Sequence, residues 1–294
     1  MEWRDRQGNI VPGEDTKNRT LSFLYGTPLG RVIVSVMIRP WVSRTAGAVM
    51  DSRLSCLAIR PFVKRNQIDM SDYEDRKYRS FNDFFTRHIR PGVRPVDSDP
   101  THLISPCDCK LSAYPITPDA KFRIKGRDYT MESLVRDGEL AARFVGGTLL
   151  LFRLTVSDYH RYIYVDDGVK GPNIPIPGVY HTVNPIAGER FPVYQENTRE
   201  YSILESAHFG TVLMMEVGAA LVGRIVNHHG PGQVRRGQEK GRFEYGGSTV
   251  ILCLQKGTAE IDGDILENTR KEIETVVKMG ERIGVSPAAG HSPG

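Results

Sequence analysis

The sequence has no long hydrophobic run and few cysteines, and each shortage excludes a class of protein. Its longest apolar region, residues 21–42, is interrupted by Arg31 and Arg39, so it lacks the roughly 20 apolar residues of a membrane-spanning helix. Four cysteines cannot form a disulfide framework for a chain of 294 residues, and Cys107 and Cys109 are too close together for a usual zinc pair. We therefore expect free thiols in a reducing compartment.

The sequence also lacks the short motifs of several common sites. No His-x-x-x-His pattern or carboxylate cluster indicates a metal, and no glycine pattern has Walker or dinucleotide spacing. The first residues, Met-Glu-Trp-Arg-Asp-Arg, have no apolar stretch, which argues against a secretory signal. We expect no metal and no nucleic-acid partner.

Positive charge is concentrated at the N-terminus. Residues 1–65 hold 11 Lys and Arg against 5 Asp and Glu, a net charge of +6, whereas residues 66–294 hold 28 against 30, a net charge of −2. The overall content of 25% charged and 39% hydrophobic residues is ordinary for a globular protein. A basic segment on a near-neutral body indicates an anionic partner.

The N-terminal part of the chain predicts a helical segment. After an exposed lead-in over residues 1–20, residues 21–66 alternate a broad apolar face with arginines, which predicts two or three helices. Two interpretations stay open: a helix pair packed on the body, or an interfacial helix in the headgroup region of a membrane with its arginines on phosphate. Residues 67–79 are typical of a solvated linker, so we divide the chain into an N-terminal segment, 1–70, and a main domain, 71–294.

The main domain predicts mostly strands. Ser80 and Asp83 are typical of the start of a short helix, a second helix is expected over residues 131–144, and residues 267–279 fit either a helix or a strand. We expect an α+β fold with a β-rich core of mixed and antiparallel sheets, and a disordered tail over 286–294. The expected strands, rich in β-branched and aromatic residues, are 148–154, 161–165, 212–217, 221–226 and 249–254.

One short motif, Gly246-Gly247-Ser248-Thr249, has the composition that backbone self-cleavage requires. Glycine allows strained backbone angles and leaves the preceding carbonyl unshielded, so the Ser248 hydroxyl could attack the carbonyl of Gly247. The apolar run that follows, residues 250–254, would anchor the serine in a buried strand. On its own, the motif is more often a turn that enters a strand.

Other motifs along the chain favour the reactive interpretation. In order and spacing, together with the Gly-Gly-Ser-Thr motif, they resemble the phosphatidylserine decarboxylase family, pyruvoyl-dependent enzymes of phospholipid synthesis, over residues 25–285. The motifs are Ser80-Phe-Asn-Asp-Phe-Phe-Thr-Arg87, Ser105-Pro-Cys-Asp108, Asp158-Tyr-His-Arg161, Val183-Asn-Pro185, Met215-Glu-Val-Gly-Ala219, Val222-Gly-Arg224 and Arg236-Gly-Gln-Glu-Lys-Gly241.

The resemblance implies a two-stage chemistry. Attack by Ser248 on Gly247 would split the chain into residues 1–247 and 248–294, which stay together as a heterodimer, and would convert Ser248 into a pyruvoyl group. That group would form a Schiff base with the amine of phosphatidylserine and act as an electron sink during decarboxylation to phosphatidylethanolamine. The net charge of +6 over residues 1–65 and the interrupted apolar face of residues 21–66 predict peripheral attachment to an anionic membrane surface, on the cytoplasmic face of the cell membrane. Whether the protein forms a homo-oligomer stays open.

The resemblance also assigns roles to individual residues. Asp108 would belong to the processing triad, and His160 would return a proton to the substrate. The family's usual second histidine corresponds to Ile163, so the processing base is either His160 or a substitute, for which we favour His181; His228 and His229 are weaker candidates. Backbone N–H groups near Gly218 and Ala219 could stabilise negative charge and contact the substrate.

Two alternatives from other functional classes stay open. Ser248 could be the nucleophile of a serine hydrolase, although the Gly-x-Ser-x-Gly pattern fails at Val250. The chain could also be a non-catalytic phospholipid-binding homologue, a reading that the isoleucine at position 163 keeps open.

Overall fold

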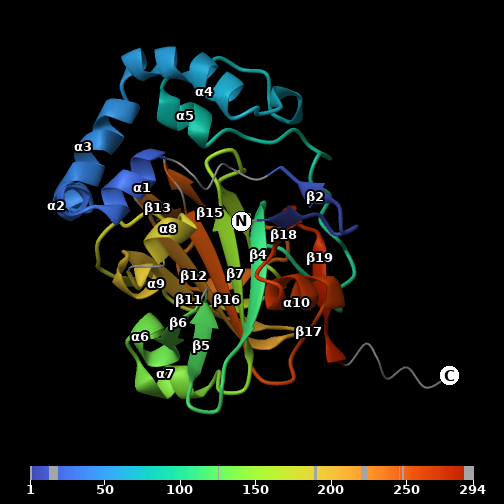
Figure 1. Cartoon of the computed structure of the whole chain (residues 1–294). Helices are drawn as coiled ribbons and strands as arrows, with labels where there is room; N and C mark the ends of the chain where they lie inside the picture. The colour runs from blue at the N-terminus through green and yellow to red at the C-terminus, as the bar shows by residue number, and fades with distance from the viewer. Residues whose placement is uncertain are drawn as a thin grey trace.

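The structure is a computed structural model that describes residues 2–12, 19–124, 126–188, 191–219, 224–244, 246 and 248–287. It combines helices with a β-rich core, which confirms the expected α+β fold (Figure 1). The helices are α1 (Arg19–Gly26), α2 (Pro28–Met37), α3 (Pro40–Met50), the 3-10 helix η1 (Arg53–Ala58), α4 (Ile59–Arg65), the 3-10 helix η2 (Met70–Asp72), α5 (Phe81–Phe85), α6 (Met131–Val135), α7 (Gly138–Ala142), α8 (Pro185–Gly188), α9 (Val193–Glu196) and α10 (Gly263–Arg270).

The strands of the described residues form one large sheet and three small ones. The large sheet has the order β14-β9-β11-β12-β16-β7-β4-β18-β1-β2, with β10 paired to β11; the small sheets are β13-β15-β8, β17-β19-β3 and β5-β6. The strands are β1 (Trp3–Arg4), β2 (Ile10–Val11), β3 (His102–Ile104), β4 (Cys109–Pro115), β5 (Lys121–Ile124), β6 (Arg127–Thr130), β7 (Thr148–Leu154), β8 (Arg161–Ile163), β9 (Gly168–Lys170), β10 (Ile174–Ile176), β11 (Arg199–Ser206), β12 (Gly210–Gly218), β13 (Arg224–Asn227), β14 (Gly232–Val234), β15 (Glu239–Glu244), β16 (Ser248–Leu254), β17 (Glu260–Ile261), β18 (Glu274–Val277) and β19 (Arg282–Val285).

The core lies on the central strands β12, β16 and β7. Every residue of β16 is buried, and so are almost all residues of its two antiparallel neighbours, which means that both faces of the sheet are covered here. This burial explains the continuous runs of Val, Ile, Leu and Met in these strands, since neither face needs polar residues. The strand that begins at Ser248 is therefore held on both sides by hydrogen bonds.

Helices α3, η1, α4 and α5 form what we call the helical cap, drawn at the top of Figure 1. A separate apolar cluster holds it together, built around Phe81, Phe84 and Phe85 of α5 with Phe62 of α4 packed edge-on against Phe81. Ser80 begins α5 as expected, because its side chain accepts a hydrogen bond from the Asp83 N–H. Helices in the N-terminal segment are confirmed, but the two or three that were expected over residues 21–66 are the four α-helices α1 to α4 and the 3-10 helix η1.

No single helix among the described residues is long and apolar enough to cross a membrane. Helices α1 and α2 would meet the length and composition together, but they are bent by 98° relative to each other.

Three local expectations were wrong. The lead-in is not simply exposed, because β1 pairs in parallel with β18 and buries Trp3 against the Lys110 ammonium, 4.9 Å from the indole ring. Tyr73, within the expected solvated linker, is also buried. The expected helix over residues 131–144 is two helices, since Arg136 adopts a left-handed conformation and the Asp137 side chain caps α7.

Long-range pairing resolves the region that fits either a helix or a strand. Residues 267–279 contain the end of α10 and then β18, which pairs with β4 and β1. The expected strand over 221–226 is seen from Arg224 onward, because residues 220–223 lie outside the described residues. Ser286 of the expected disordered tail is buried, and residues 288–294 lie outside the description.

Candidate active site

Ser248 is the first residue of β16, at the centre of the large sheet. Its neighbours across the sheet are Gly218, the last residue of β12, and Leu154, the last residue of β7. Ser248 is fully buried. Gly246 has a φ of 129°, a backbone conformation that favours glycine, and Gly247 lies outside the described residues. The motif therefore leads into a central strand, and the Ser248 hydroxyl lies at the buried start of that strand.

His160 lies beside Ser248, in the loop that connects β7 to β8. Its Nδ1 atom is 3.3 Å from Ser248 Oγ, and its Nε2 atom is 3.0 Å from the carbonyl oxygen of Thr155. A carbonyl only accepts hydrogen bonds, so the neutral ring carries its proton on Nε2 and presents the Nδ1 lone pair to the serine hydroxyl. This is the geometry of a general base next to its nucleophile.

Burial keeps the His160 ring uncharged. Removal from water lowers the pKa of His160 to about 3; the nearby Asp158 carboxylate opposes this shift and the Arg87 guanidinium adds to it. The ring of Phe85 covers the imidazole, with 4.2 Å between the ring centroids. At neutral pH the imidazole is therefore unprotonated and able to accept the proton of Ser248.

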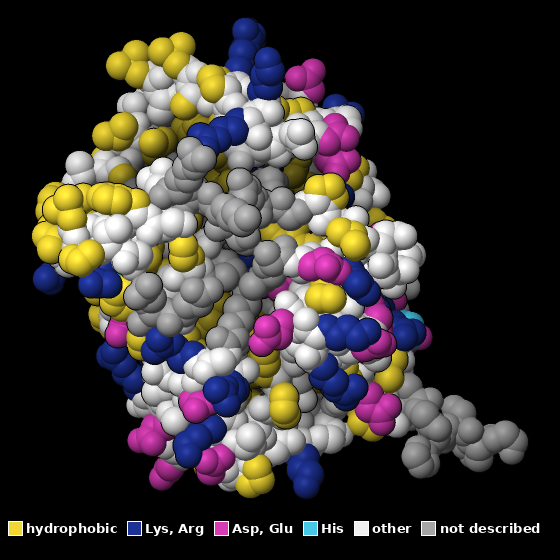
Figure 2. Space-filling view, viewed as in Figure 1, with side chains coloured by type: hydrophobic (Ala, Val, Ile, Leu, Met, Phe, Trp, Pro, Cys, Tyr) yellow, Lys and Arg dark blue, Asp and Glu magenta, His cyan; other side chains and the backbone are white. Residues whose placement is uncertain are grey.

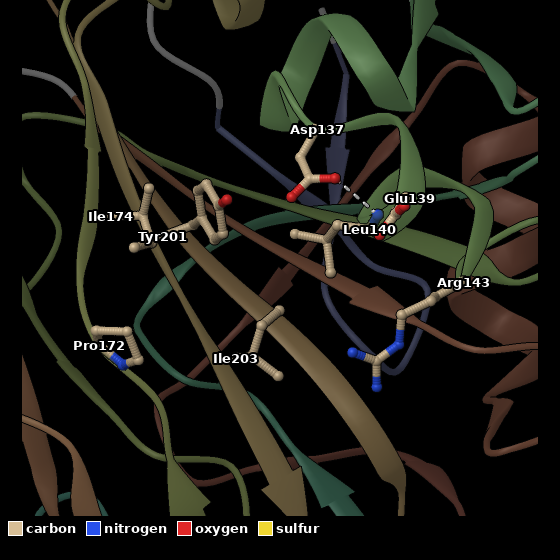
Figure 3. A pocket seen from close by; sticks show the side chains of 8 residues that line it. All are labelled: Asp137, Glu139, Leu140, Arg143, Pro172, Ile174, Tyr201 and Ile203. Atoms are coloured by element: carbon tan, nitrogen blue, oxygen red, sulfur yellow. Dashed lines mark hydrogen bonds between the residues drawn. The ribbon is translucent and has the colours of Figure 1, made fainter.

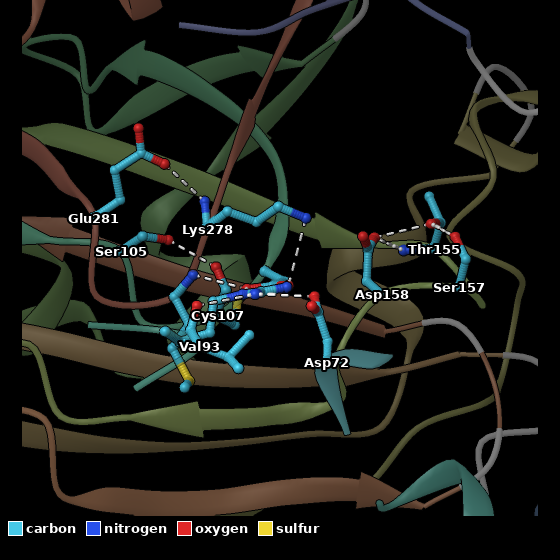
Figure 4. Close-up of polar contacts among 12 residues, drawn as sticks. Asp72, Val93, Ser105, Cys107, Thr155, Ser157, Asp158, Lys278 and Glu281 are labelled. Atoms are coloured by element: carbon cyan, nitrogen blue, oxygen red, sulfur yellow. Dashed lines mark hydrogen bonds and ion pairs between the residues drawn. The ribbon is translucent and has the colours of Figure 1, made fainter. Parts of the chain in front are cut away.

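A buried ion pair shapes the loop that carries His160. The Asp158 carboxylate accepts a hydrogen bond from Lys110 Nζ at 2.7 Å. It also accepts hydrogen bonds from both the N–H and the hydroxyl of Thr155 (Figure 4). Burial would raise the pKa of Asp158, but the charge and hydrogen bonds of Lys110 hold it below its usual value. Because Thr155 is fixed in this way, its carbonyl is held where His160 Nε2 donates to it.

Asp108 lies in the turn before β4, and its carboxylate contacts other groups than His160. Arg94 donates to both of its oxygens, with the shortest contact at 2.8 Å, and the Met279 N–H donates to it at 2.8 Å. The Lys278 ammonium lies 3.6 Å away. Among the described residues, the hydrogen bonds of His160 include none to Asp108.

His181 is buried next to α9. Its ring stacks on Phe191 with 4.4 Å between centroids, its Nε2 atom is 3.4 Å from a Glu196 oxygen, and its Nδ1 atom has no hydrogen-bond partner within the described part of the chain. Burial lowers the pKa of His181 to about 4. None of these contacts is with Ser248, so the structure brings His160, and not His181, to the serine oxygen.

Gly218 of β12 pairs with Ser248 of the neighbouring strand β16, and Ala219 follows Gly218 in the chain. The Gly218 N–H donates to the carbonyl of Thr198 at 2.9 Å, and the Gly218 carbonyl accepts from Asn197 Nδ2 at 2.7 Å. Both backbone groups of Gly218 are thus engaged in this state of the chain, and Ala219 is buried.

The remaining sequence candidates lie around β8 and β15. The Ile163 side chain is buried. His228 Nε2 lies 2.8 Å from a Glu239 oxygen, and His229 contacts Gln238 and Tyr164, so both histidines have partners of their own.

In the part of the chain that the structure describes, neither a metal cluster nor the cavity of Figure 3 lies at Ser248. Within the described residues, no group of three His, Cys, Asp or Glu side chains could hold a metal ion, and all four cysteines are free. A surface cavity of about 340 Å³ (Figure 3) is lined by Ile174, Tyr201 and Ile203 together with acidic and basic residues of α7 and its flanks. Its lining includes neither Ser248 nor His160.

Sequence reasoning missed most of the residues that position the candidate side chains. Thr155 and the pair of Lys110 with Asp158 hold the His160 loop, and Asn197 bridges the carbonyls of His181 and Gly218. Thr155 is five residues from His160, but Lys110 is 48 residues from Asp158, and Asn197 is 16 and 21 residues from its two partners, so no local pattern signals these longer contacts.

Comparisons with known proteins place these residues in a family context. A sequence model described as phosphatidylserine decarboxylase matches residues 81–285. The chain is 45% identical over 269 residues to phosphatidylserine decarboxylase proenzyme 2 of Clostridium acetobutylicum, covering 91% of this chain and 92% of the relative. It is 41% identical to the proenzyme of Clostridium novyi (90% and 92% covered) and 40% identical to that of Desulfitobacterium hafniense (91% and 92% covered).

Proposed function

Because the chain belongs to the phosphatidylserine decarboxylase family, we propose that it cleaves itself between Gly247 and Ser248 and then removes the carboxylate of phosphatidylserine. The observation that carries this proposal is the contact of 3.3 Å between Ser248 Oγ and the unprotonated Nδ1 of His160. A buried hydroxyl beside a neutral base is what an attack on the preceding carbonyl requires.

The self-cleavage step uses residues of this chain alone. His160 Nδ1 takes the hydroxyl proton while Ser248 Oγ attacks the carbonyl carbon of Gly247, and the peptide C–N bond breaks to give an ester and a free amine. Loss of the α-proton of Ser248 then expels the Gly247 carboxylate, which ends the first chain, and leaves a dehydroalanine at position 248. Water hydrolyses the imine tautomer of this residue to the pyruvoyl carbonyl, and its nitrogen leaves as ammonia. The Thr155 carbonyl keeps the His160 ring oriented during the transfer, because it holds the Nε2 proton.

The residues around Ser248 fit a pyruvoyl group at this position. Ser248 is buried and lies between Gly218, which adds no side chain, and Leu154, so a planar group of similar size has room without exposure to water. Such a group supplies an electron sink for the electron pair that remains when carbon dioxide leaves. In our proposal His160 relays the proton that is returned to the substrate, since its Nδ1 atom is in contact with Ser248 Oγ.

A mass measurement of the purified protein tests the proposal. We expect a 247-residue chain and a 47-residue chain that lacks a free amino terminus, together with release of carbon dioxide from phosphatidylserine. A serine hydrolase or a non-catalytic homologue would remain one chain of 33.0 kDa, and that result in fresh, active material would overturn the proposal.

The helices provide a surface that fits peripheral attachment to a membrane. Exposed apolar side chains gather over α2 and α3 at the upper left of Figure 2, next to a segment that is rich in arginine. We call this the apolar ridge; its members are Leu29, Val32, Val36, Trp41, Val49, Leu54 and Leu57. Exposed apolar patches of this kind mark interaction sites, and neighbouring cations favour anionic lipid. We propose that the ridge inserts at the membrane surface, which places the substrate near the protein.

Replacing Leu54 and Leu57 together by glutamate should reduce flotation with vesicles that contain phosphatidylserine by about tenfold or more. Both leucines are about 80% exposed, so folding should be unaffected, whereas each buried leucine contributes roughly 1.5–3 kcal/mol at a membrane. Val169→Glu is the matched control, because Val169 is an exposed apolar residue of β9, outside the ridge. Flotation of the double variant equal to that of the unmodified protein would contradict the proposed attachment.

A further inference from the structure

Arg87 is a fully buried cation whose hydrogen bonds are incomplete. Its Nη2 atom donates to the Tyr73 hydroxyl at 3.1 Å and to the Ser157 carbonyl at 3.4 Å. Its Nε and Nη1 atoms are buried and have no hydrogen-bond partner within the described residues. The side chain has no exposed surface, and no ion pair of the described residues includes it. A buried guanidinium with two unpartnered nitrogens is unusual, since the loss of hydration is not compensated.

Four other buried cations differ from Arg87 in this respect. Lys110 pairs with Asp158, Lys240 with Glu216, and Arg153 with Glu274. Arg199 has no carboxylate, but its three nitrogens donate to four backbone carbonyls. Lys170 donates to one carbonyl, that of Gly171, and Arg236 has one buried nitrogen without a partner within the described residues, whereas Arg87 has two.

Arg87 lies at the seam between the helical cap and the loop that carries His160. The Tyr73 and Phe84 rings pack on the guanidinium, at 4.1 and 4.9 Å from its carbon, from the cap side. Ser157 contacts it from the loop, and Phe85, two residues earlier, covers the His160 ring. Arg87 is thus a fixed positive charge between the helices that carry the apolar ridge and the site at Ser248.

We propose that Arg87 binds the phosphodiester anion of the lipid substrate through Nε and Nη1. The inference rests on the proposed function, because it assumes that the serine headgroup reaches Ser248. The phosphate joins the serine to the glycerol, so with the acyl chains at the ridge and the amine at Ser248 it must lie between the two, where Arg87 is. No atom of Arg87 is exposed in this structure, so the headgroup reaches it when the cap and the loop separate.

The chemistry of the reaction favours the phosphate over the carboxylate as the anion that Arg87 holds. A guanidinium on the carboxylate would stabilise the group that must lose its charge as carbon dioxide forms, and this would raise the barrier. The phosphodiester keeps its charge from substrate to product. Its two oxygens also match the forked geometry of the arginine nitrogens.

Arg87→Gln and Arg87→Lys, assayed in mixed micelles, test the assignment. Both variants are first checked for cleavage into two chains. For Arg87→Gln we expect the KM for phosphatidylserine and the Ki of phosphatidylethanolamine, which has the phosphate but no carboxylate, to rise together by about 10- to 100-fold. Arg87→Lys should recover part of both losses. Arg76→Gln is the matched control, since Arg76 also lies over a tyrosine ring, that of Tyr78, but has a carboxylate partner in Asp83.

Three outcomes separate the possible roles. A rise in KM with an unchanged Ki for phosphatidylethanolamine would mean that Arg87 holds the carboxylate, and unchanged values of both would mean a structural role; each overturns the proposal. If Arg87→Gln does not fold, Arg87→Lys decides. Phosphatidylethanolamine with a methylated, uncharged phosphate should inhibit the unmodified enzyme less than phosphatidylethanolamine itself does. This loss of inhibition should be smaller in Arg87→Lys. An uncleaved, inactive unmodified protein would instead refute the proposed function itself.

Discussion

Replacement of Ser248 by alanine should leave the protein as one chain of 33.0 kDa without detectable decarboxylation. The hydroxyl is the proposed nucleophile of the cleavage, and the same residue is the proposed source of the pyruvoyl group, so one substitution removes both stages. We expect the activity to fall by more than about 10⁴-fold, as it does when a nucleophile is deleted. Mass spectrometry and release of labelled carbon dioxide measure the two effects.

Ser202→Ala is the matched control for this experiment. Ser202 is also buried in the large sheet, on β11, and its hydroxyl has no hydrogen-bond partner among the described residues. The same chemical change should therefore leave cleavage and activity intact and cost little stability. Efficient cleavage of the Ser248→Ala protein at the Gly247 position would show that another nucleophile acts and would refute the mechanism.

His160→Ala should slow self-cleavage by about 10²- to 10⁴-fold, whereas His181→Ala should leave it nearly unchanged. His160 is the imidazole in contact with Ser248 Oγ, and its lowered pKa keeps it unprotonated at neutral pH. His181 packs on Phe191 and contacts Glu196, so its removal should lower the free energy of unfolding by about 1–3 kcal/mol through lost packing. The cleaved fraction over time and urea denaturation of each variant provide the measurements.

The low pKa of His160 also predicts how cleavage depends on pH. Its ring stays neutral as the pH falls from 8 to 5, so the cleavage rate should be nearly constant over that range, unlike that of an exposed histidine with a pKa near 6.5. An intact chain in the His181→Ala protein, with normal cleavage of His160→Ala, would reverse the assignment of the base.

The β-rich core and the residues of the reactive contact could be predicted from the sequence, because the relevant signals are local. The apolar run after Ser248 indicates a buried strand, and the motif with His160 stands in a recognisable order along the chain. The preference for His181 as the base rests on the expectation that the loop before His181 returns beside the strand that carries His160. The structure shows instead that the loop directly after β7 brings His160 to Ser248.

Features that depend on distant pairing could not be predicted in this way. The strand at Trp3 has two residues, and its pairing with β18, some 270 residues later, joins it and its neighbour β2 to the large sheet. Asp108 looks like a free turn carboxylate until Arg94 and the Met279 N–H are placed next to it. Arg87 ends the motif of residues 80–87, yet the sequence does not show that two of its nitrogens have no hydrogen-bond partner. This becomes visible only when its neighbours in space among the described residues are known.

The position of Ser248 at the head of a central strand has a consequence for how the protein can be assembled. A cut before β16 leaves the second chain with β16 to β19, and β16 lies between β12 and β7 while β18 lies between β4 and β1, all four from the first chain. The two pieces are interleaved, because the large sheet and the sheet β17-β19-β3 each combine strands from both chains, whereas the sheets β13-β15-β8 and β5-β6 lie within the first chain. The intact polypeptide finds this arrangement as one molecule. After the proposed cut, an unfolded protein would need two separate chains to meet and interleave, so we expect the native state to be reached before the cut and preserved afterwards by the slowness of unfolding.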